Sequence, residues 1–347
     1  MTEQNIVTEQ KMAETQTLPP RRGGRLEAWL GTETYRMFKG LVTNPISVIG
    51  IILLTFFIVV ALAAPVLAPP TQNQDPYQIP RDGYGAVPKP PGTPWDVRPP
   101  ELPFWWKPIM GTDQWIHIMG TASGQWDIYY GVVWGTRTAL RVGLTITAIT
   151  ALIGIIVGTI SAYYGGPVDM ILMRVADIFI AFPFMVAAMT LSAVLTPVLG
   201  KGLFPPMIAL IVFGWTGYAR LLRSDILSVR EREYVLASRV TGVRDLRIMF
   251  RHILPNAIFP TLVVASMRIG SYVITFAALS FLGIGAEVGY ADWGQLLSFA
   301  RDWMTNLGEY WYIVFFPGTA LVLFVLSWNL VGDALRDVLD PRLQGSR

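Results

Sequence analysis

Residues 46–67 read ISVIGIILLTFFIVVALAAPVL, an uncharged run of almost entirely apolar side chains. A helix needs roughly 20 mostly apolar residues to cross the hydrocarbon core of a bilayer, so this run predicts a membrane-spanning helix. Further apolar runs lie at about 139–163, 168–199, 206–222, 261–284 and 311–331. Pro183 lies inside the run at 168–199 and predicts a kink there. We therefore predict an all-α integral membrane protein with six transmembrane helices.

The composition agrees with a chain that is largely embedded in lipid. Of the 347 residues, 52% are hydrophobic and only 15% are charged, whereas a soluble domain carries about 25% charged residues. The net charge of +3 is small, and the basic residues lie beside apolar runs, so no nucleic-acid partner is indicated. There is no cysteine and there are two histidines, His117 and His252, which argues against disulfides and predicts no metal site.

The distribution of Lys and Arg predicts the orientation. Basic residues precede the first span and crowd the segment between the fourth and fifth spans, where eight arginines lie between Arg220 and Arg251. By contrast, the loops after the third and fifth spans hold only Lys201 and Arg301. Because cytoplasmic loops carry the excess of Lys and Arg, we place both termini in the cytoplasm. The expected location is the cell (inner) membrane, as a multi-pass protein.

Two segments flank the first span at 45–67. Residues 61–65, ALAAP, resemble a signal-peptide cleavage site, but the apolar run begins after some 45 mostly polar residues, unlike a signal peptide. Residues 1–44 are therefore predicted to be a flexible cytoplasmic tail. Residues 68–137 are rich in Pro and Trp and predict a long, turn-rich extracytoplasmic segment, because helices cannot run through its prolines. It is either a contact surface for an outside partner or an insulating cap over the helix ends.

The polar segment 224–256, SDILSVREREYVLASRVTGVRDLRIMFRHILPN, is too polar to span a membrane and too regular for a plain loop. Ser228 and Glu231 have the spacing of a capping box that starts a helix. Gly242 is suited to end that helix, and Asp245 to begin a second one with an apolar side. Pro255 is expected to end the second helix before the fifth span. The prediction is a helix–turn–helix lying under the membrane.

This segment resembles the EAA loop of ABC importer permeases. Ala237 and Ser238 stand within the position of the Glu-Ala-Ala triplet, Gly242 matches the family glycine, and Leu254 and Pro255 match its Leu-Pro. Leu236 stands where the glutamate is expected, with Glu233 one turn earlier. The resemblance extends along the chain after about residue 44, through NPISVIGIILL, GWTGYARLLRSDILSVREREYV, ASMRIGSYVITFAALSFLGIG and NLVGDALRDVLDPRL. These motifs are similar to the second permease of dipeptide/oligopeptide importers.

The resemblance implies a type I ABC permease fold and a function. Residues 138–332 would form a five-helix permease core, and 333–347 a cytoplasmic C-terminal tail. The chain would be one half of the path of an ATP-driven importer of peptides or oligosaccharides, and not an enzyme. Its expected partners are a second permease, two cytoplasmic ATP-binding subunits and an extracytoplasmic substrate-binding protein. The coupling loop to the ATPases is expected to use Glu233, Ala237, Ser238, Gly242, Asp245, Leu254 and Pro255.

The chain is expected to bind no cofactor itself, because it lacks the G-x-x-x-x-G-K-[ST] phosphate loop. ATP and Mg would belong to the partner ATPases. A secondary transporter or channel without such partners is the alternative, although no internal repeat is apparent and the 224–256 segment would then lack a purpose. A membrane enzyme is a third reading, but no nucleophile–base pair or metal-ligand cluster appears in the sequence.

Charged residues inside the predicted spans are candidate intramembrane sites, because charge in a membrane is costly. Arg268 in the fifth span either lines the translocation path or makes an ion pair or carbonyl contact near the cytoplasmic helix end. Arg174 and Asp177 in the third span are three residues apart and could pair with each other.

Overall fold

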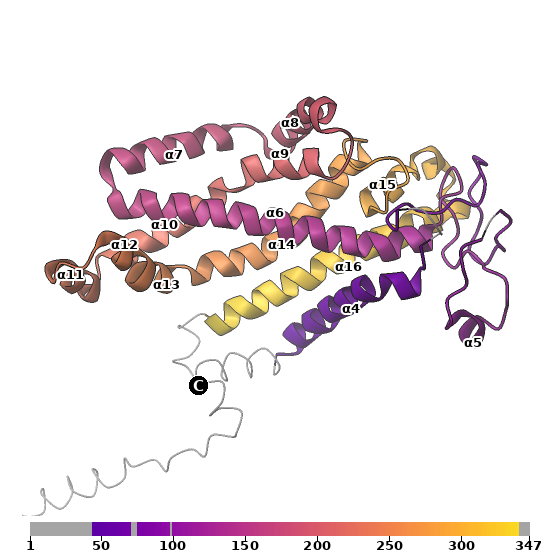
Figure 1. Ribbon diagram of the computed structural model, residues 1–347, viewed down its shortest axis with the longest axis horizontal. Helices are drawn as coiled ribbons and strands as arrows, with labels where there is room; N and C mark the ends of the chain where they lie inside the picture. The colour runs from indigo at the N-terminus through magenta and orange to yellow at the C-terminus, as the bar shows by residue number, and fades with distance from the viewer. Residues whose placement is uncertain (1–43, 71–74, 98, 340–347) are drawn as a thin grey trace, which may run out of the picture.

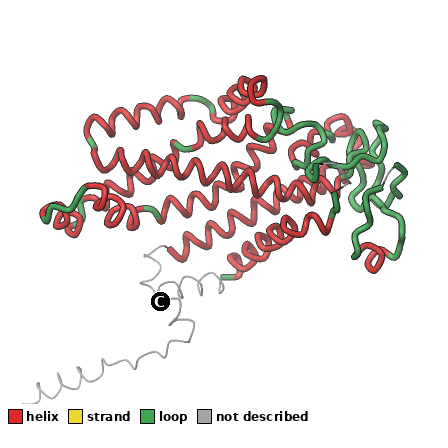
Figure 2. Tube along the Cα trace, in the orientation of Figure 1, coloured by secondary structure: helices red, strands yellow, loops and turns green. Residues whose placement is uncertain are grey.

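The computed structural model describes residues 44–70, 75–97 and 99–339. The predicted N-terminal tail, except for Asn44, and the last eight residues of the predicted C-terminal tail lie outside this part of the chain. Within the described residues the structure is helical with loops, and β structure is limited to isolated bridges such as Gln78 with Tyr290 (Figure 2). In chain order the elements, labelled as in Figure 1, are α4 (Pro45–Leu67), α5 (Trp106–Met110), α6 (Ile128–Tyr164), α7 (Gly166–Ala181), α8 (Phe184–Leu199), α9 (Phe204–Gly214), α10 (Thr216–Arg230), α11 (Glu233–Val240), α12 (Asp245–Ile248), the π-helix η1 (Met249–Ile253), α13 (Leu254–Ala257), α14 (Phe259–Phe281), α15 (Trp293–Ser298), the 3-10 helix η2 (Arg301–Asn306) and α16 (Leu307–Leu339).

Four helices of the described chain are long and apolar enough to cross a membrane: α4, α6, α14 and α16, the last taken together with η2. The bent pair α7 and α8 brings the number to five if it forms a single span. The structure thus bears out a multi-pass helical architecture, and a sixth crossing is not among these candidates. α16 continues to Leu339, so the first part of the predicted C-terminal tail at 333–347 is helical.

Local sequence explains where the first two spans begin. Asn44 caps α4 by accepting a hydrogen bond from the Ile46 amide at 3.0 Å, and Pro45 occupies the first turn, where its missing N–H costs nothing. Asp127 caps α6 in the same way, through the Tyr130 amide at 2.8 Å. α6 has 37 residues and starts at Ile128, well before the predicted start of the second span at about residue 139. Its first residues therefore lie in the segment 68–137, which was predicted to be an extracytoplasmic loop.

The predicted third and fourth spans are each broken. α7 and α8 meet at Phe182 and Pro183 with a bend of 87°, a much larger change of direction than the kink that the proline predicted. α9 and α10 meet at Trp215, and their 11 and 15 residues are each too few for a span alone. Pro183 at the first junction has no N–H to continue the helical hydrogen-bond ladder, which accounts for the sharp bend between α7 and α8.

Glycines bring the central helices into close contact. A Cβ on Gly158 of α6 would lie 2.6 Å from the Ala219 carbonyl oxygen of α10, and one on Gly143 would lie 2.8 Å from Val273 Cγ2 of α14. Helices in a bilayer associate through such small-residue contacts, because hydrophobic burial gives little net gain in lipid. α6 therefore forms the centre of the bundle, between α10 and α14 (Figure 1).

The two ends of the bundle differ. The described loops of residues 68–70, 75–97 and 99–127, together with α5 and α15, gather at one end. At the other end α11, α12 and α13 protrude, and there α4 begins and α16 ends (Figure 1). Tryptophans pack against one another in this loop layer: the rings of Trp106 and Trp115 stack with their centres 4.2 Å apart, and both side chains are buried. The layer is thus a packed structure of its own and not an extended chain.

Candidate functional site

The protruding segment begins where α10 ends. Ser228 lies in the last turn of α10 and Glu231 is its C-cap residue, so the capping box predicted to start a helix is wrong. The physical reason is burial: Ile226 and Val229 pack into an apolar cluster with Leu222, which carries α10 through to Arg230. The next helix, α11, begins at Glu233 without a side-chain cap.

Gly242 ends α11 in the predicted way. Its φ of +76° lies in the left-handed region that a side chain disfavours. The Gly242 amide donates to the Arg239 carbonyl at 3.0 Å and the Val243 amide donates to the Ser238 carbonyl at 3.2 Å. This pair of bonds is a Schellman motif, which satisfies two carbonyls at the helix end and fixes the turn into α12.

The second half of the segment is continuous helix, not a helix terminated by proline. α12 begins at Asp245, as predicted, and its carboxylate accepts a hydrogen bond from the Tyr163 hydroxyl of α6. The chain then passes through η1 into α13, where Pro255 occupies the first turn. Pro255 therefore does not end the helix. Proline lacks the backbone N–H, and this costs little in the first turn of a helix, where that group would have no intrahelical partner. The π-helical turn just before Pro255 accommodates the altered hydrogen-bond spacing.

The segment buries one side and exposes the other. Val235, Ile248, Met249 and Ile253 are buried against α10. The opposite side presents large apolar residues to solvent, with Val240 89% exposed, Leu246 64%, Phe250 61% and Leu236 47%. The sequence analysis did not identify these residues as an exposed apolar surface, although Leu236 was noted where a glutamate was expected. An exposed apolar surface of this kind is typical of a protein–protein contact.

The structure brings the predicted coupling residues together at this tip. Glu233, Ala237, Gly242 and Asp245 are exposed on α11, its turn and the start of α12. Ser238 is partly covered, and its hydroxyl donates to the Tyr234 carbonyl at 2.8 Å. At the base of the tip, Leu254 packs against the buried cluster and Pro255 is exposed.

The charges inside the spans pair differently from the prediction. Asp177 of α7 forms an ion pair with Arg220 of α10, not with Arg174, so the predicted i,i+3 pair is wrong. The side chains of Arg174 and Asp177 are both exposed on α7, and an arginine on the neighbouring helix reaches the carboxylate directly. A second pair joins the same helices: Arg223 binds both carboxylate oxygens of Asp169, each at 2.5 Å. Two ion pairs thus join α7 to α10. The spacing of charged residues within one helix could not reveal these contacts between helices.

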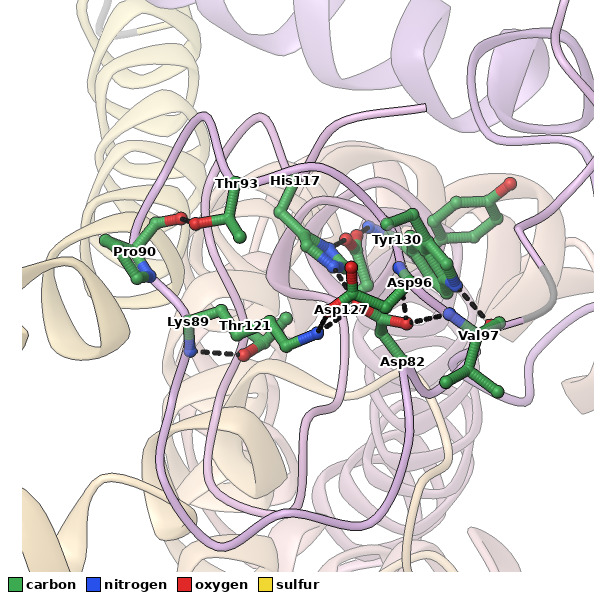
Figure 3. Close-up of polar contacts among 11 residues, drawn as sticks. Asp82, Lys89, Pro90, Thr93, Asp96, Val97, His117, Thr121, Asp127 and Tyr130 are labelled. Atoms are coloured by element: carbon green, nitrogen blue, oxygen red, sulfur yellow. Dashed lines mark hydrogen bonds and ion pairs between the residues drawn. The ribbon is translucent and has the colours of Figure 1, made fainter. Parts of the chain in front are cut away.

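A buried ionic network lies in the loop layer at the other end (Figure 3). His117 Nδ1 lies 2.6 Å from Asp127 Oδ2, and His117 Nε2 lies 3.1 Å from Asp82 Oδ2, with all three side chains fully buried. Lys89 Nζ contacts Asp82 at 2.5 Å and Asp96 at 2.6 Å. Since Asp127 also caps α6, this network ties the loop layer to the start of a spanning helix.

The network determines the charge on His117. Burial by itself lowers the pKa of His117, but the hydrogen bonds and charges of Asp127 and Asp82 outweigh it and raise the pKa above its ordinary value. Burial raises the pKa of Asp82, yet hydrogen bonds from Lys89, His117 and two backbone amides hold the pKa of that carboxyl below its usual range. Both ring nitrogens lie next to a carboxylate oxygen, an arrangement in which the protonated ring can donate from each nitrogen.

This network was not predicted, because Asp82 and His117 lie 35 positions apart in the sequence. Among the described residues, no group of three His, Cys, Asp or Glu side chains is placed to hold a metal ion.

Asp292 gives a prediction on pH dependence at this end of the molecule. It is 5% exposed and caps α15 through the Gln295 amide at 3.2 Å. Burial raises the pKa of Asp292 to about 6. Ionisation is thus disfavoured in the folded state, and its cost develops as the pH rises from the unfolded value near 3.9 to about 6. Asp292→Asn keeps the capping oxygen without the charge, so it should raise the thermal unfolding midpoint at pH 8 by a few degrees.

At pH 4 the Asp292→Asn variant and the wild type should unfold at nearly the same temperature, because the carboxyl is then mostly neutral. The control is Asp302→Asn, which removes an exposed carboxylate from η2 and should shift the midpoint little at either pH. An equal effect of Asp292→Asn at pH 4 and pH 8 would contradict a buried, titrating carboxyl.

Comparison with known proteins gives two family matches. Residues 152–345 match the family described as binding-protein-dependent transport system inner membrane component. Residues 34–91 match the N-terminal TM domain of oligopeptide transport permease C. Together the two matches include most of the chain.

Individual relatives cover long stretches at substantial identity. A dipeptide transport system permease protein of Alkalihalophilus pseudofirmus is 33% identical over 307 residues, 88% of this chain and 89% of that protein. A putative peptide transport system permease protein of Brucella suis is 40% identical over 228 residues, 66% of this chain and 74% of its own length. An oligopeptide transport system permease protein of Bacillus subtilis is 37% identical over 228 residues, 66% and 72% of the two chains. Among solved structures, a chain of the MetNI methionine ABC transporter in inward-facing conformations matches with a TM-score of 0.45 and 21% identity, covering 60% of this chain and 97% of that chain.

Proposed function

The chain belongs to the family of binding-protein-dependent transport system inner membrane components, and from that premise we propose that it forms half of the translocation path of a peptide importer. As a permease subunit it is a transport component and not itself an enzyme. Peptides are the proposed cargo because the relatives described above are named for dipeptide, peptide and oligopeptide transport. Oligosaccharide cargo has no such support.

The observation that carries the proposal is the protruding tip formed by α11 and α12. A short helix held at both ends, with an exposed apolar side, is suited to dock in a groove of another protein and to move with it as a rigid body. We infer that the groove belongs to a cytoplasmic ATP-binding subunit, one of two, and that these subunits hold ATP and Mg. A second permease and an extracytoplasmic substrate-binding protein complete the proposed assembly.

The proposed topology has six crossings of the cell (inner) membrane, with both termini in the cytoplasm. α4, α6, α14 and α16 supply four, the bent pair α7–α8 a fifth, and α9 with α10 the sixth. In support, the α11–α13 tip lies at the same end as the start of α4 and the end of α16 (Figure 1). This end also carries the arginine-rich segment, which the rule on cytoplasmic positive charge places inside the cell.

Site-specific crosslinking tests both the coupling role and the topology. The chain has no cysteine, so each introduced thiol is unique within it. In membranes that hold the whole importer, Ala237→Cys with a short bifunctional reagent is expected to capture an ATP-binding subunit, which mass spectrometry identifies. The control is Val288→Cys, 65% exposed in the loop before α15 at the opposite end, and it should capture none. Capture from Val288 and not from Ala237 would reverse the proposed orientation.

Transport itself tests the cargo. The importer reconstituted in vesicles should accumulate short peptides in the presence of ATP and its loaded binding protein. Accumulation of an oligosaccharide and not of peptides would leave the permease role intact and reject peptides as the cargo.

A further inference from the structure

Arg268 lies well inside α14, at a depth where a charged side chain is costly unless it has a partner or contacts water. It follows Phe259, the first residue of the helix, by nine positions, which is about 13 Å along the axis at 1.5 Å per residue. Its side chain is exposed on the chain. Among the ion pairs of the described residues, none includes Arg268. The described residues therefore supply no acidic partner for Arg268, so an ion pair within them, one of the alternatives considered from the sequence, is not found.

The contacts of Arg268 hold its guanidinium without neutralising it. The guanidinium carbon lies 5.7 Å from the centre of the Tyr218 ring of α10. Beside it, a Cβ on Gly217 would lie 3.4 Å from Arg268 Nη2, so the absence of a side chain there leaves space for the arginine. An aromatic face attracts a cation but takes up none of its N–H groups as a carboxylate would. The guanidinium therefore keeps donors available for a further partner.

Arg268 is part of a polar stripe on α14. Ser271 and Thr275 follow it at intervals of three and four residues, which places all three on one side of the helix. Ser271 is exposed and Thr275 is partly exposed. A face that contacts lipid looks different on this chain: α4 exposes Ile52 and Leu62, the latter 73% accessible, among other apolar residues. The Thr275 hydroxyl donates to the Ser271 carbonyl of its own helix at 2.9 Å, so the Arg268 charge is the group that is costly against lipid. This charge makes the polar stripe suited to a water-accessible path.

We propose that Arg268 binds the terminal carboxylate of peptide cargo as it moves along the polar stripe of α14. The inference rests on the proposed function, since it requires a peptide importer. A guanidinium presents a planar fork of N–H donors that matches a carboxylate in two parallel hydrogen bonds. Every unmodified linear peptide carries this group whatever its side chains, so one arginine can serve cargo of varied sequence.

Uptake of a matched peptide pair tests this role. A free-acid peptide and its C-terminally amidated form are chosen so that the binding protein loads both, and each is supplied at saturation to the whole importer in vesicles. Arg268→Gln is expected to reduce uptake of the free acid about tenfold or more, in line with the loss of a charged hydrogen bond, and to change uptake of the amide little. Arg268→Lys, which keeps the charge but not the fork, should retain part of the uptake of the free acid.

The control is Arg174→Gln, which removes an exposed arginine from α7 and should affect both peptides equally. An equal loss for both peptides in Arg268→Gln, the result expected if Arg268 pairs with an acid of another subunit, overturns the carboxylate site. So does the absence of any loss. If the wild-type importer takes up neither peptide, the proposed cargo fails and the carboxylate site fails with it.

Cysteine accessibility supplies an independent measurement of the path. Ser271→Cys should react with a water-soluble methanethiosulfonate, and saturating free-acid peptide on its binding protein should slow the reaction. Leu62→Cys on the outward side of α4 should not react, because a thiol in lipid is not ionised. A Ser271→Cys variant as unreactive as Leu62→Cys would show that the stripe is closed to water and would reject the path.

Discussion

Replacing His117 with leucine is expected to speed hydrogen exchange of backbone amides in the loop layer about a hundredfold or more. The variant leaves the carboxylates of Asp82 and Asp127 buried without the imidazolium that lies between them. Removing one partner of a buried ion pair costs about 3–5 kcal/mol, because an uncompensated charge remains. The sensitive amides are those of Thr121 and Asp127, which donate to the carbonyls of Lys89 at 2.9 Å and Pro80 at 3.1 Å. Exchange measured by mass spectrometry on the purified importer reports their opening.

The matched control is the exposed pair of Lys107 and Asp113, which has an N–O distance of 3.0 Å in the same layer. Lys107→Gln should change exchange little, since an exposed ion pair contributes roughly 0–1 kcal/mol. Exchange in His117→Leu that stays within a few fold of the wild type would mean that the network does not hold the layer together.

The same network predicts a pH dependence with a definite sign. The pKa of His117 is raised in the folded state, so its stabilisation is fully present below the unfolded value near 6.5 and is lost as the pH rises through the higher folded value. Protection of the Asp127 amide should therefore fall on the alkaline side in the wild type, after correction for intrinsic exchange. In His117→Leu this dependence should be absent. The carboxyl of Asp82 acts in the opposite direction, and its contribution is lost only in acid.

The spans that could be predicted from the sequence are those set by local composition. The predicted span at 46–67 corresponds to α4 almost residue for residue. An uninterrupted apolar stretch that follows the capping residue Asn44 and Pro45 determines both the type of element and where it begins. The start of α6 was missed because residues 128–138 mix aromatic, glycine and polar side chains with one charge, Arg137, and only Asp127 marks the helix start. The bend at Pro183 was underestimated, because its angle of 87° depends on how α7 and α8 pack and not on the proline alone.

The candidate site shows the same division between local and long-range information. The turn at Gly242 depends on a single residue, whose lack of a side chain allows a positive φ, and it was predicted from the sequence. The capping box at Ser228 failed because its pattern also fits the interior of a helix, and the burial of Val229 decided between the two. The contact of His117 with Asp82 and the ion pairs between α7 and α10 join residues from 35 to 54 positions apart. No local pattern carries such contacts, so they appear only once the fold is known.

Val240→Asp is expected to weaken binding of the ATP-binding subunit about thirtyfold or more and to reduce peptide uptake by a similar factor. Val240 is 89% exposed at the end of α11, next to the Gly242 turn and on the same tip as Leu236. In the proposed complex this apolar side chain enters the groove of the ATPase. A carboxylate there would lose its water without gaining a partner, and the few hot-spot residues of an interface each account for about 2 kcal/mol or more. The affinity is measured by titrating the purified ATPase onto the permease pair in detergent.

The fold of the variant should not change, because Val240 makes few contacts within its own chain, so the effect separates docking from stability. Val240→Thr is the matched control: it keeps the branched shape without adding a charge and should bind the ATPase nearly as well as the wild type. The unfolding midpoint of both variants should match the wild type. If Val240→Asp binds and transports normally, the exposed apolar side of α11 is not the docking surface. The coupling contact would then have to use the other exposed apolar residues, Leu246 and Phe250, on the second half of the tip.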